Sequence, residues 1–231
     1  PILLDRRNDS SSAFYRKLEI HGDYAYVADY GHAIRAYDIS DPTNIVQTDS
    51  ISLSYATDVS VYGDIAFVAD GTYGVYYFNI TNPADLVYDS SFDVFTNVTS
   101  VDAEGGKLYV TEDLAGVIGQ CIYVYDITDI QAPVQLGSQV LDGEFYDISI
   151  DGDVAYTAAG RWTLPYNVSN PALPIYTSFT TITTYGVWGF GPYALSTGDG
   201  VSLIDCTDMT SIDHTINYYP DVTTGLQVTT R

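Results

Sequence analysis

One block of alternating apolar and polar residues recurs five times along the 231-residue chain, and this repetition constrains the fold more than any other feature. The block reads LEIHGDYAYVAD at 18–29, VSVYGDIAFVAD at 59–70, VDAEGGKLYVTED at 101–113, ISIDGDVAYTAAG at 148–160 and VWGFGPYALSTGDG at 187–200. In each copy a turn glycine separates two runs that alternate with the two-residue period of a strand: Gly22, Gly63, Gly105, Gly152 and Gly191. Two alternating runs around a tight glycine turn predict a β-hairpin.

A second block follows each hairpin. It reads AIRAYDISDP at 33–42, GVYYFNITNP at 74–83, CIYVYDITDI at 121–130, TLPYNVSNP at 163–171 and GVSLIDCTDM at 200–209. We expect a third strand that ends in a turn built on an Asp or Asn side chain, and then a more polar fourth strand such as DLVYDSSFD at 85–93. Four strands in about 40 residues, repeated along a chain, are the signature of β-propeller blades.

The predicted fold is therefore an all-β propeller that occupies residues 1–231 as a single domain. Its five complete repeats are expected at 17–58, 59–100, 101–147, 148–186 and 187–225. Residues 1–16 align with the outer strand of a partial blade and residues 226–231 with an inner strand, which predicts six blades.

The apolar residues of these end segments are candidates for assembly: Ile2, Leu3, Leu4, Leu226 and Val228. Because an unpaired strand edge is a template for another chain, we expect either a longer native chain or self-assembly through the terminal strands.

The pairing of the AYVAD-type hairpin with the YDISDP-type third strand resembles the LVIVD repeat family of prokaryotic surface proteins. The matching segments are AYVAD at 25–29, AFVAD at 66–70 and YDISDP at 37–42, whereas TLPYNVSNP and GPYALSTGDG depart from the pattern. The resemblance spans residues 17 to about 225. It implies a propeller at the cell surface or outside the cell, and it implies no activity.

The net charge of the chain argues against one class of partner, nucleic acids. Thirty acidic and 8 basic residues give a net charge of −22, and Lys17 and Lys107 are the only lysines. Such a surface repels phosphate backbones, so we expect no nucleic-acid binding. No apolar run approaches the 18 residues of a membrane span. A surface short of Lys and Arg and rich in Ser, Thr and Tyr favours an extracellular or cell-surface location.

Two kinds of site are predicted from individual residues. Asp58 and Asp147 directly precede predicted first strands, where carboxylates near a shared axis would hold Ca²⁺ or would instead cap turns. Four Asn residues stand in glycosylation sequons, namely Asn8, Asn79, Asn97 and Asn167. Asn79 and Asn167 also occupy the turn position where other repeats carry Asp, and turn formation is the alternative role there.

Other residues give weaker signals. Cys121 and Cys206 fall in repeats that are not neighbours, so we expect unpaired thiols. Aromatic side chains near the predicted faces would stack on sugars or, as we favour, fill the core: Tyr146, Trp162, Tyr185 and Trp188.

No catalytic motif is present. The expected function is a non-enzymatic surface propeller in adhesion, surface-layer or filament assembly. The alternatives are a propeller hydrolase or lyase with a channel metal, and a ligand-binding module of a larger secreted protein.

Overall fold

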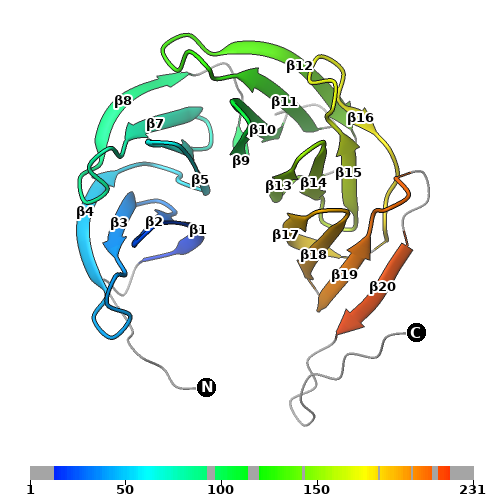
Figure 1. Cartoon of the computed structure of the whole chain (residues 1–231), viewed down its shortest axis with the longest axis horizontal. Helices are drawn as coiled ribbons and strands as arrows, with labels where there is room; N and C mark the ends of the chain where they lie inside the picture. Colours follow the sequence, from blue (N-terminus) through cyan, green and yellow to red (C-terminus); the bar gives the residue numbers. More distant parts are fainter. Residues whose placement is uncertain are drawn as a thin grey trace. The chain divides into compact units, whose positions relative to one another are not determined.

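The computed structural model describes residues 13–92, 97–113, 120–141, 144–181, 183–198, 200–209 and 213–218. These residues form five four-stranded antiparallel sheets, each with its strands in chain order from one edge to the other (Figure 1). The all-β propeller class expected from the repeats is confirmed, with one sheet, or blade, for each repeat. Of the terminal segments assigned to a partial sixth blade, residues 1–12 and 226–231 lie outside the described residues. Tyr15 and Arg16 were assigned to the outer strand of that blade and instead belong to β1, the first strand of blade 1.

The chain divides into two compact units, residues 1–103 and 104–231. In the first unit, blade 1 contains β1 (Tyr15–His21), β2 (Tyr24–Asp29), β3 (Ala33–Asp38) and β4 (Val46–Ser52), and blade 2 contains β5 (Asp58–Tyr62), β6 (Ile65–Ala69), β7 (Val75–Asn79) and β8 (Val87–Phe92). Blade 3 spans the boundary, with β9 (Val98–Glu104), β10 (Lys107–Asp113), β11 (Gln120–Asp126) and β12 (Val134–Leu141).

The second unit continues with two more blades. Blade 4 contains β13 (Asp147–Asp151), β14 (Val154–Ala158), β15 (Thr163–Asn167) and β16 (Ile175–Tyr176). Blade 5 contains β17 (Thr184–Phe190), β18 (Tyr193–Gly198), β19 (Val201–Asp205) and β20 (Asp213–Tyr218). The short fourth strand of blade 4 follows Pro165 in β15, because proline has no N–H to donate to a strand ladder.

The predicted turn glycines close the first hairpin of every blade. Gly63 has a φ of +59° and Gly152 a φ of +58°, the left-handed conformation that a residue with a Cβ rarely adopts. The second predicted turn is present too. The Asp38 side chain accepts the Ser40 N–H at 2.9 Å, and Asp126 accepts the Thr128 N–H at 2.8 Å. Local sequence therefore determines both turns of each repeat.

Each blade has two faces, which we name from the packing of blades 1 and 2. The forward face of blade 1 presents Tyr26, Ala28 and Ile34, and these side chains are fully buried against Val59 and Val68 on the rear face of blade 2. Antiparallel register keeps each set on one face, since Tyr26 pairs with Ala36 and Ala28 pairs with Ile34. The core of the first unit thus lies between two stacked sheets.

The second unit repeats this packing. Tyr109 and Ile122 on the forward face of blade 3 meet Ile148 and Tyr166 on the rear face of blade 4. Tyr156 on the forward face of blade 4 packs against blade 5, where a Cβ on Gly189 would lie 2.4 Å from the Tyr156 ring. The Tyr156 hydroxyl also donates to the carbonyl of Gly191 at 2.8 Å. One aromatic side chain therefore packs and orients the next sheet.

Neighbouring blades are also joined by a ladder of side chains that accept hydrogen bonds from the first strand of the next blade and from the hairpin turn that follows it. In the second unit, Asp147, Ser149 and Asp151 accept the backbone N–H groups of Val187, Gly189 and Gly191 at 2.9, 3.0 and 2.6 Å. In the first unit, Asp58 and Ser60 accept those of Val101 and Ala103 at 3.0 and 3.1 Å. Alternate residues of a strand point to one side, so a D-x-S sequence places both acceptors on the edge of the next blade.

Candidate interaction surface

Four aromatic residues of the first unit lie in loops at one end of its sheets, and we call them the aromatic row: Phe14, Tyr30, Tyr55 and Tyr73. Phe14 precedes β1, Tyr30 follows β2, Tyr55 lies between β4 and β5, and Tyr73 lies between β6 and β7. In an antiparallel sheet the start of the first strand, the end of the second and the start of the third meet at one end. The topology therefore brings residues up to 59 positions apart (14 to 73) to one end of the unit.

The rings of the row contact one another in sequence. Ring centroids lie 6.2 Å apart for Phe14 and Tyr30, 5.8 Å for Tyr30 and Tyr55, and 6.1 Å for Tyr55 and Tyr73. The Arg16 guanidinium lies 5.2 Å from the Phe14 centroid and 4.9 Å from that of Tyr30, within the range of cation–π attraction. Phe14, Tyr55 and Tyr73 remain exposed although they form this cluster. Contiguous exposed aromatic surface marks an interaction site more often than isolated apolar residues do.

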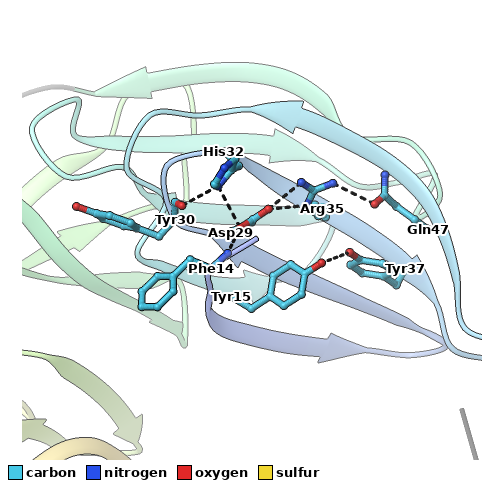
Figure 2. Close-up of polar contacts among 8 residues, drawn as sticks. All are labelled: Phe14, Tyr15, Asp29, Tyr30, His32, Arg35, Tyr37 and Gln47. Atoms are coloured by element: carbon cyan, nitrogen blue, oxygen red, sulfur yellow. Dashed lines mark hydrogen bonds and ion pairs between the residues drawn. The ribbon is translucent and has the colours of Figure 1, made fainter. Parts of the chain in front are cut away.

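Two buried carboxylates hold the loops of the row in place. Asp29 accepts the Phe14 N–H at 2.8 Å, and it binds Arg35 through Nε at 2.9 Å and Nη2 at 2.7 Å (Figure 2). In blade 2 the corresponding Asp70 accepts the backbone N–H of Tyr55. Burial raises the pKa of Asp70, and its two backbone hydrogen bonds oppose that rise. Loops fixed in this way lose little conformational freedom when a partner binds.

The polar contacts of Asp29 extend to both sides of the loop. His32 Nδ1 lies 3.0 Å from the Tyr30 carbonyl and 3.5 Å from Asp29 Oδ1. Arg35 continues to Gln47 Oε1 at 3.1 Å (Figure 2). The aromatic row therefore stands on a connected set of hydrogen bonds and ion pairs that spans three strands of blade 1.

The two predicted calcium ligands are buried and lie in different units. Asp58 accepts the backbone N–H of the next residue, Val59, at 2.8 Å, and that of Val101 in blade 3 at 3.0 Å. Asp147 likewise accepts the Ile148 N–H at 3.0 Å and the Val187 N–H at 2.9 Å. Among the described residues, no three His, Cys, Asp or Glu side chains form a group that could hold a metal ion. A calcium role for these two positions stays a prediction.

The predicted glycosylation sites occupy different environments. Asn79 Oδ1 accepts the Thr81 N–H at 2.9 Å, and Asn167 Oδ1 accepts the Ser169 N–H at 3.0 Å, so both form the turn that Asp forms elsewhere. Asn97 is half-buried directly before β9. Asn8 lies outside the described residues, as do the candidate assembly residues Ile2, Leu3, Leu4, Leu226 and Val228. Modification and strand-mediated assembly stay predictions.

Other candidates from the sequence are also located by the structure. Cys121 and Cys206 are free and buried, as expected. The preference for core positions is wrong for Tyr146, Tyr185 and Trp188, which are exposed, whereas Trp162 is half-buried against the core of blades 3 and 4. Tyr146 precedes β13, whereas Tyr185 and Trp188 lie in β17. The aromatic row was not predicted from the sequence. The pattern that could have indicated it is the aromatic residue in each of the loops next to Asp29 and Asp70.

The sheets and their packing define a β-propeller. The LVIVD repeat model matches residues 16–51 and 54–94, so the first two blades are LVIVD repeats. These repeats are typical of secreted or cell-surface proteins. A search of curated proteins finds no match to the chain.

Solved structures share the fold at low sequence identity. The nidogen/laminin complex aligns with a TM-score of 0.69 at 12% identity, covering 90% of this chain and 81% of that chain. A functionally unknown protein from Desulfotomaculum acetoxidans DSM 771 gives a TM-score of 0.68 at 12% identity, covering 87% and 68%. The computationally designed Ika8 protein gives 0.63 at 10% identity, covering 91% and 64%. At these sequence identities the structural similarity establishes the fold alone, and the function has to be argued from the residues of the site.

Among the described residues, no helix has the length and apolar character needed to cross a membrane.

Proposed function

We propose that this chain is a non-enzymatic propeller of the cell surface or the extracellular space, which acts in adhesion by holding a protein partner on the aromatic row. The observation that carries the proposal is the run of ring contacts from Phe14 through Tyr30 and Tyr55 to Tyr73, exposed at one end of the first unit. Exposed tyrosines on fixed loops supply large contact area at a low cost in side-chain entropy.

A protein partner suits this chemistry best. Tyrosine, phenylalanine and arginine are enriched where proteins meet, and a few such residues carry most of the binding free energy. The row adds the Arg16 guanidinium to four aromatic rings, so the site offers a cation on a chain whose net charge is −22. The LVIVD repeats of blades 1 and 2 support the external location, because this repeat is typical of secreted or cell-surface proteins.

Bead adhesion with a matched variant tests the proposal. Beads coated with the full chain should adhere to intact cells of the source organism, and protease treatment of the cells should abolish adhesion. Beads coated with the Y55S/Y73S variant should adhere at least about tenfold less, because each hot-spot aromatic residue contributes about 2 kcal/mol or more to binding. Tyr62 is the matched control, since it is 42% exposed against 43% for Tyr55 and lies at the opposite end of its sheet.

Three results would contradict the proposal. The first is unchanged adhesion of Y55S/Y73S, and the second is an equal loss in Y62S. The third is adhesion that survives protease treatment, which would point to a saccharide in place of a protein. Surface biotinylation of intact cells tests the location separately, because a labelled chain must be external.

A further inference from the structure

Two exposed tyrosines of the second unit meet at a right angle, and we call them the tyrosine corner: Tyr146 and Tyr185. Tyr146 directly precedes β13, and Tyr185 is the second residue of β17. Their ring centroids lie 5.2 Å apart, with 86° between the ring planes, and the two residues are 42% and 55% exposed. Aromatic rings carry negative charge on their faces, so a ligand in the angle between these rings meets two negative surfaces.

Backbone hydrogen bonds hold both rings of the corner in place. The Tyr146 N–H donates to the Ala158 carbonyl at 2.8 Å. Tyr185 follows Thr184, whose N–H and carbonyl bond to Gly160 at 2.6 and 3.1 Å. Gly160 has a φ of +64°, and a Cβ there would lie 3.3 Å from Tyr146 Cε2, so this loop supports the ring. A site fixed in this way loses little conformational freedom on binding.

Carboxylates lie beside the corner. The Tyr146 hydroxyl donates to Glu144 Oε2. This hydrogen bond, then burial, and then neighbouring groups that include Asp113 raise the pKa of Tyr146 to about 12. Asp113 ends β10 and is exposed, whereas Asp29 and Asp70, which end the second strands of blades 1 and 2, are buried. The corner therefore combines two aromatic rings with surface carboxylates.

We propose that the tyrosine corner, with the Glu144 carboxylate beside it, binds the ammonium group of an alkylammonium ligand. A cation close to the face of a tyrosine ring is attracted by it, and aromatic cages recognise choline and methyl-lysine in this way. The net charge of −22 also draws cations to the chain. Cation–π contacts printed by the described part of the chain involve Arg16, and none joins Arg161 of the neighbouring loop to either ring. This site is chemically distinct from the aromatic row and does not rest on the proposed adhesion.

The composition of the corner favours an organic cation over a metal ion. Ca²⁺ takes six or more oxygen ligands, whereas ring faces supply none. Among the described residues, no three His, Cys, Asp or Glu side chains form a group that could hold a metal. An alkylammonium group instead lays its carbon atoms on the rings of Tyr146 and Tyr185 while its charge faces Glu144.

An NMR titration tests the proposal on the full chain, isotope-labelled at its tyrosine rings. The probes are choline and N-acetyl-lysine methylamide, added at constant ionic strength. The ring signals of Tyr146 and Tyr185, assigned from their loss in Y146S and Y185S, should shift and saturate with at least one probe. The tighter probe assigns the source of the ammonium group, which is a free quaternary ammonium compound for choline and a lysine side chain for the amide.

Line broadening of the probe's own signal measures the affinity of each variant. Y146S/Y185S should bind at least about tenfold more weakly, because it loses two cation–π contacts, whereas Y185F keeps the ring and should bind within about twofold of wild type. E144Q should also weaken binding, because it removes the carboxylate. Y193S is the matched control, since Tyr193 is 37% exposed against 42% for Tyr146 and lies at the hairpin end of β18, away from Tyr185.

Three results would overturn the proposal. The first is the absence of a shift at either ring with both probes. The second is equal affinity for dimethylbutanol, the neutral carbon analogue of choline, which would make the contact purely apolar. The third is binding that survives in Y146S/Y185S, which keeps every carboxylate and would then reveal general attraction to an acidic chain. The first two results need only the wild-type chain, so they decide the matter even if the double variant does not fold.

Discussion

The Asp147 carboxylate accepts the backbone N–H of Val187 at 2.9 Å, and this bond joins the first strands of blades 4 and 5. The same relationship joins Asp58 to Val101 at 3.0 Å in the first unit. Both carboxylates are nearly inaccessible to solvent, and each also accepts the N–H of the residue that follows it. A buried N–H without an acceptor is costly, so these carboxylates stabilise the edge of the next sheet.

Replacing Asp147 should therefore destabilise the second unit. D147A leaves the N–H groups of Ile148 and Val187 without their acceptor and should lower the free energy of unfolding by about 1–3 kcal/mol in urea denaturation. The loss should be the same with calcium and with a chelator, if the carboxylate acts through these bonds alone. D153A, at an exposed turn of the same blade, is the control and should change little. A D147A variant as stable as wild type would show that the bond contributes nothing.

Gly189 tests the packing of the forward tyrosine. A Cβ at this position would lie 2.4 Å from Tyr156 Cδ2 and 2.6 Å from Cε2, so G189A forces the ring or the strand to move. We expect a loss of about 1–3 kcal/mol in the free energy of unfolding. Y156A removes the ring and is itself destabilising, but G189A should cost little in the Y156A background. Additive losses in this double-mutant cycle would show that the two residues do not interact.

The turns and strands could be predicted because their determinants are local. Gly63 and Gly152 adopt positive φ in the hairpins expected of them, and Asp38 and Asp126 form the expected side-chain turns. The aromatic row could not be predicted, because Tyr30 and Tyr55 meet only after two sheets stack. Asp147 was identified as a special position, but its partner Val187 is 40 residues away, and sequence spacing does not reveal which strand edge a carboxylate faces.

The Glu19 carboxyl makes the free energy of unfolding depend on pH, and its raised pKa fixes the direction of that dependence. Burial first, and then the charge of Asp102, raise the pKa of the Glu19 carboxyl above 4.5, and Lys17 partly offsets them. A raised carboxyl pKa means that the folded state binds the proton more tightly than the unfolded state. This contribution to stability is therefore present below pH 4.5 and is lost as pH rises through the folded pKa.

The E19Q variant removes that titration. It should be more stable than wild type at pH 7, by about a few tenths of a kcal/mol after allowance for solvent screening, and the difference should vanish near pH 4. Thermal unfolding at the two pH values measures it. E144Q, at an exposed glutamate of the second unit, serves as the control. An E19Q variant less stable than wild type at pH 7 would show that the charged carboxylate is favourable in the folded state.

Thiol reactivity provides a direct measure of burial in both units of the described chain. Burial, followed by the charge of Asp205, raises the pKa of Cys206 to about 12, and burial is also the main cause of the raised pKa of Cys121. Because the thiolate is the reactive species, folded protein at pH 8 should take up iodoacetamide at neither cysteine, while protein unfolded in guanidinium should take up two equivalents. Intact-mass spectrometry counts the adducts. Since Cys206 packs between blades 4 and 5, Y156A should accelerate labelling at Cys206 and leave Cys121 protected. Rapid labelling of native wild-type protein at either position would contradict the burial of that thiol, and fewer than two equivalents on the unfolded protein would contradict the unpaired state.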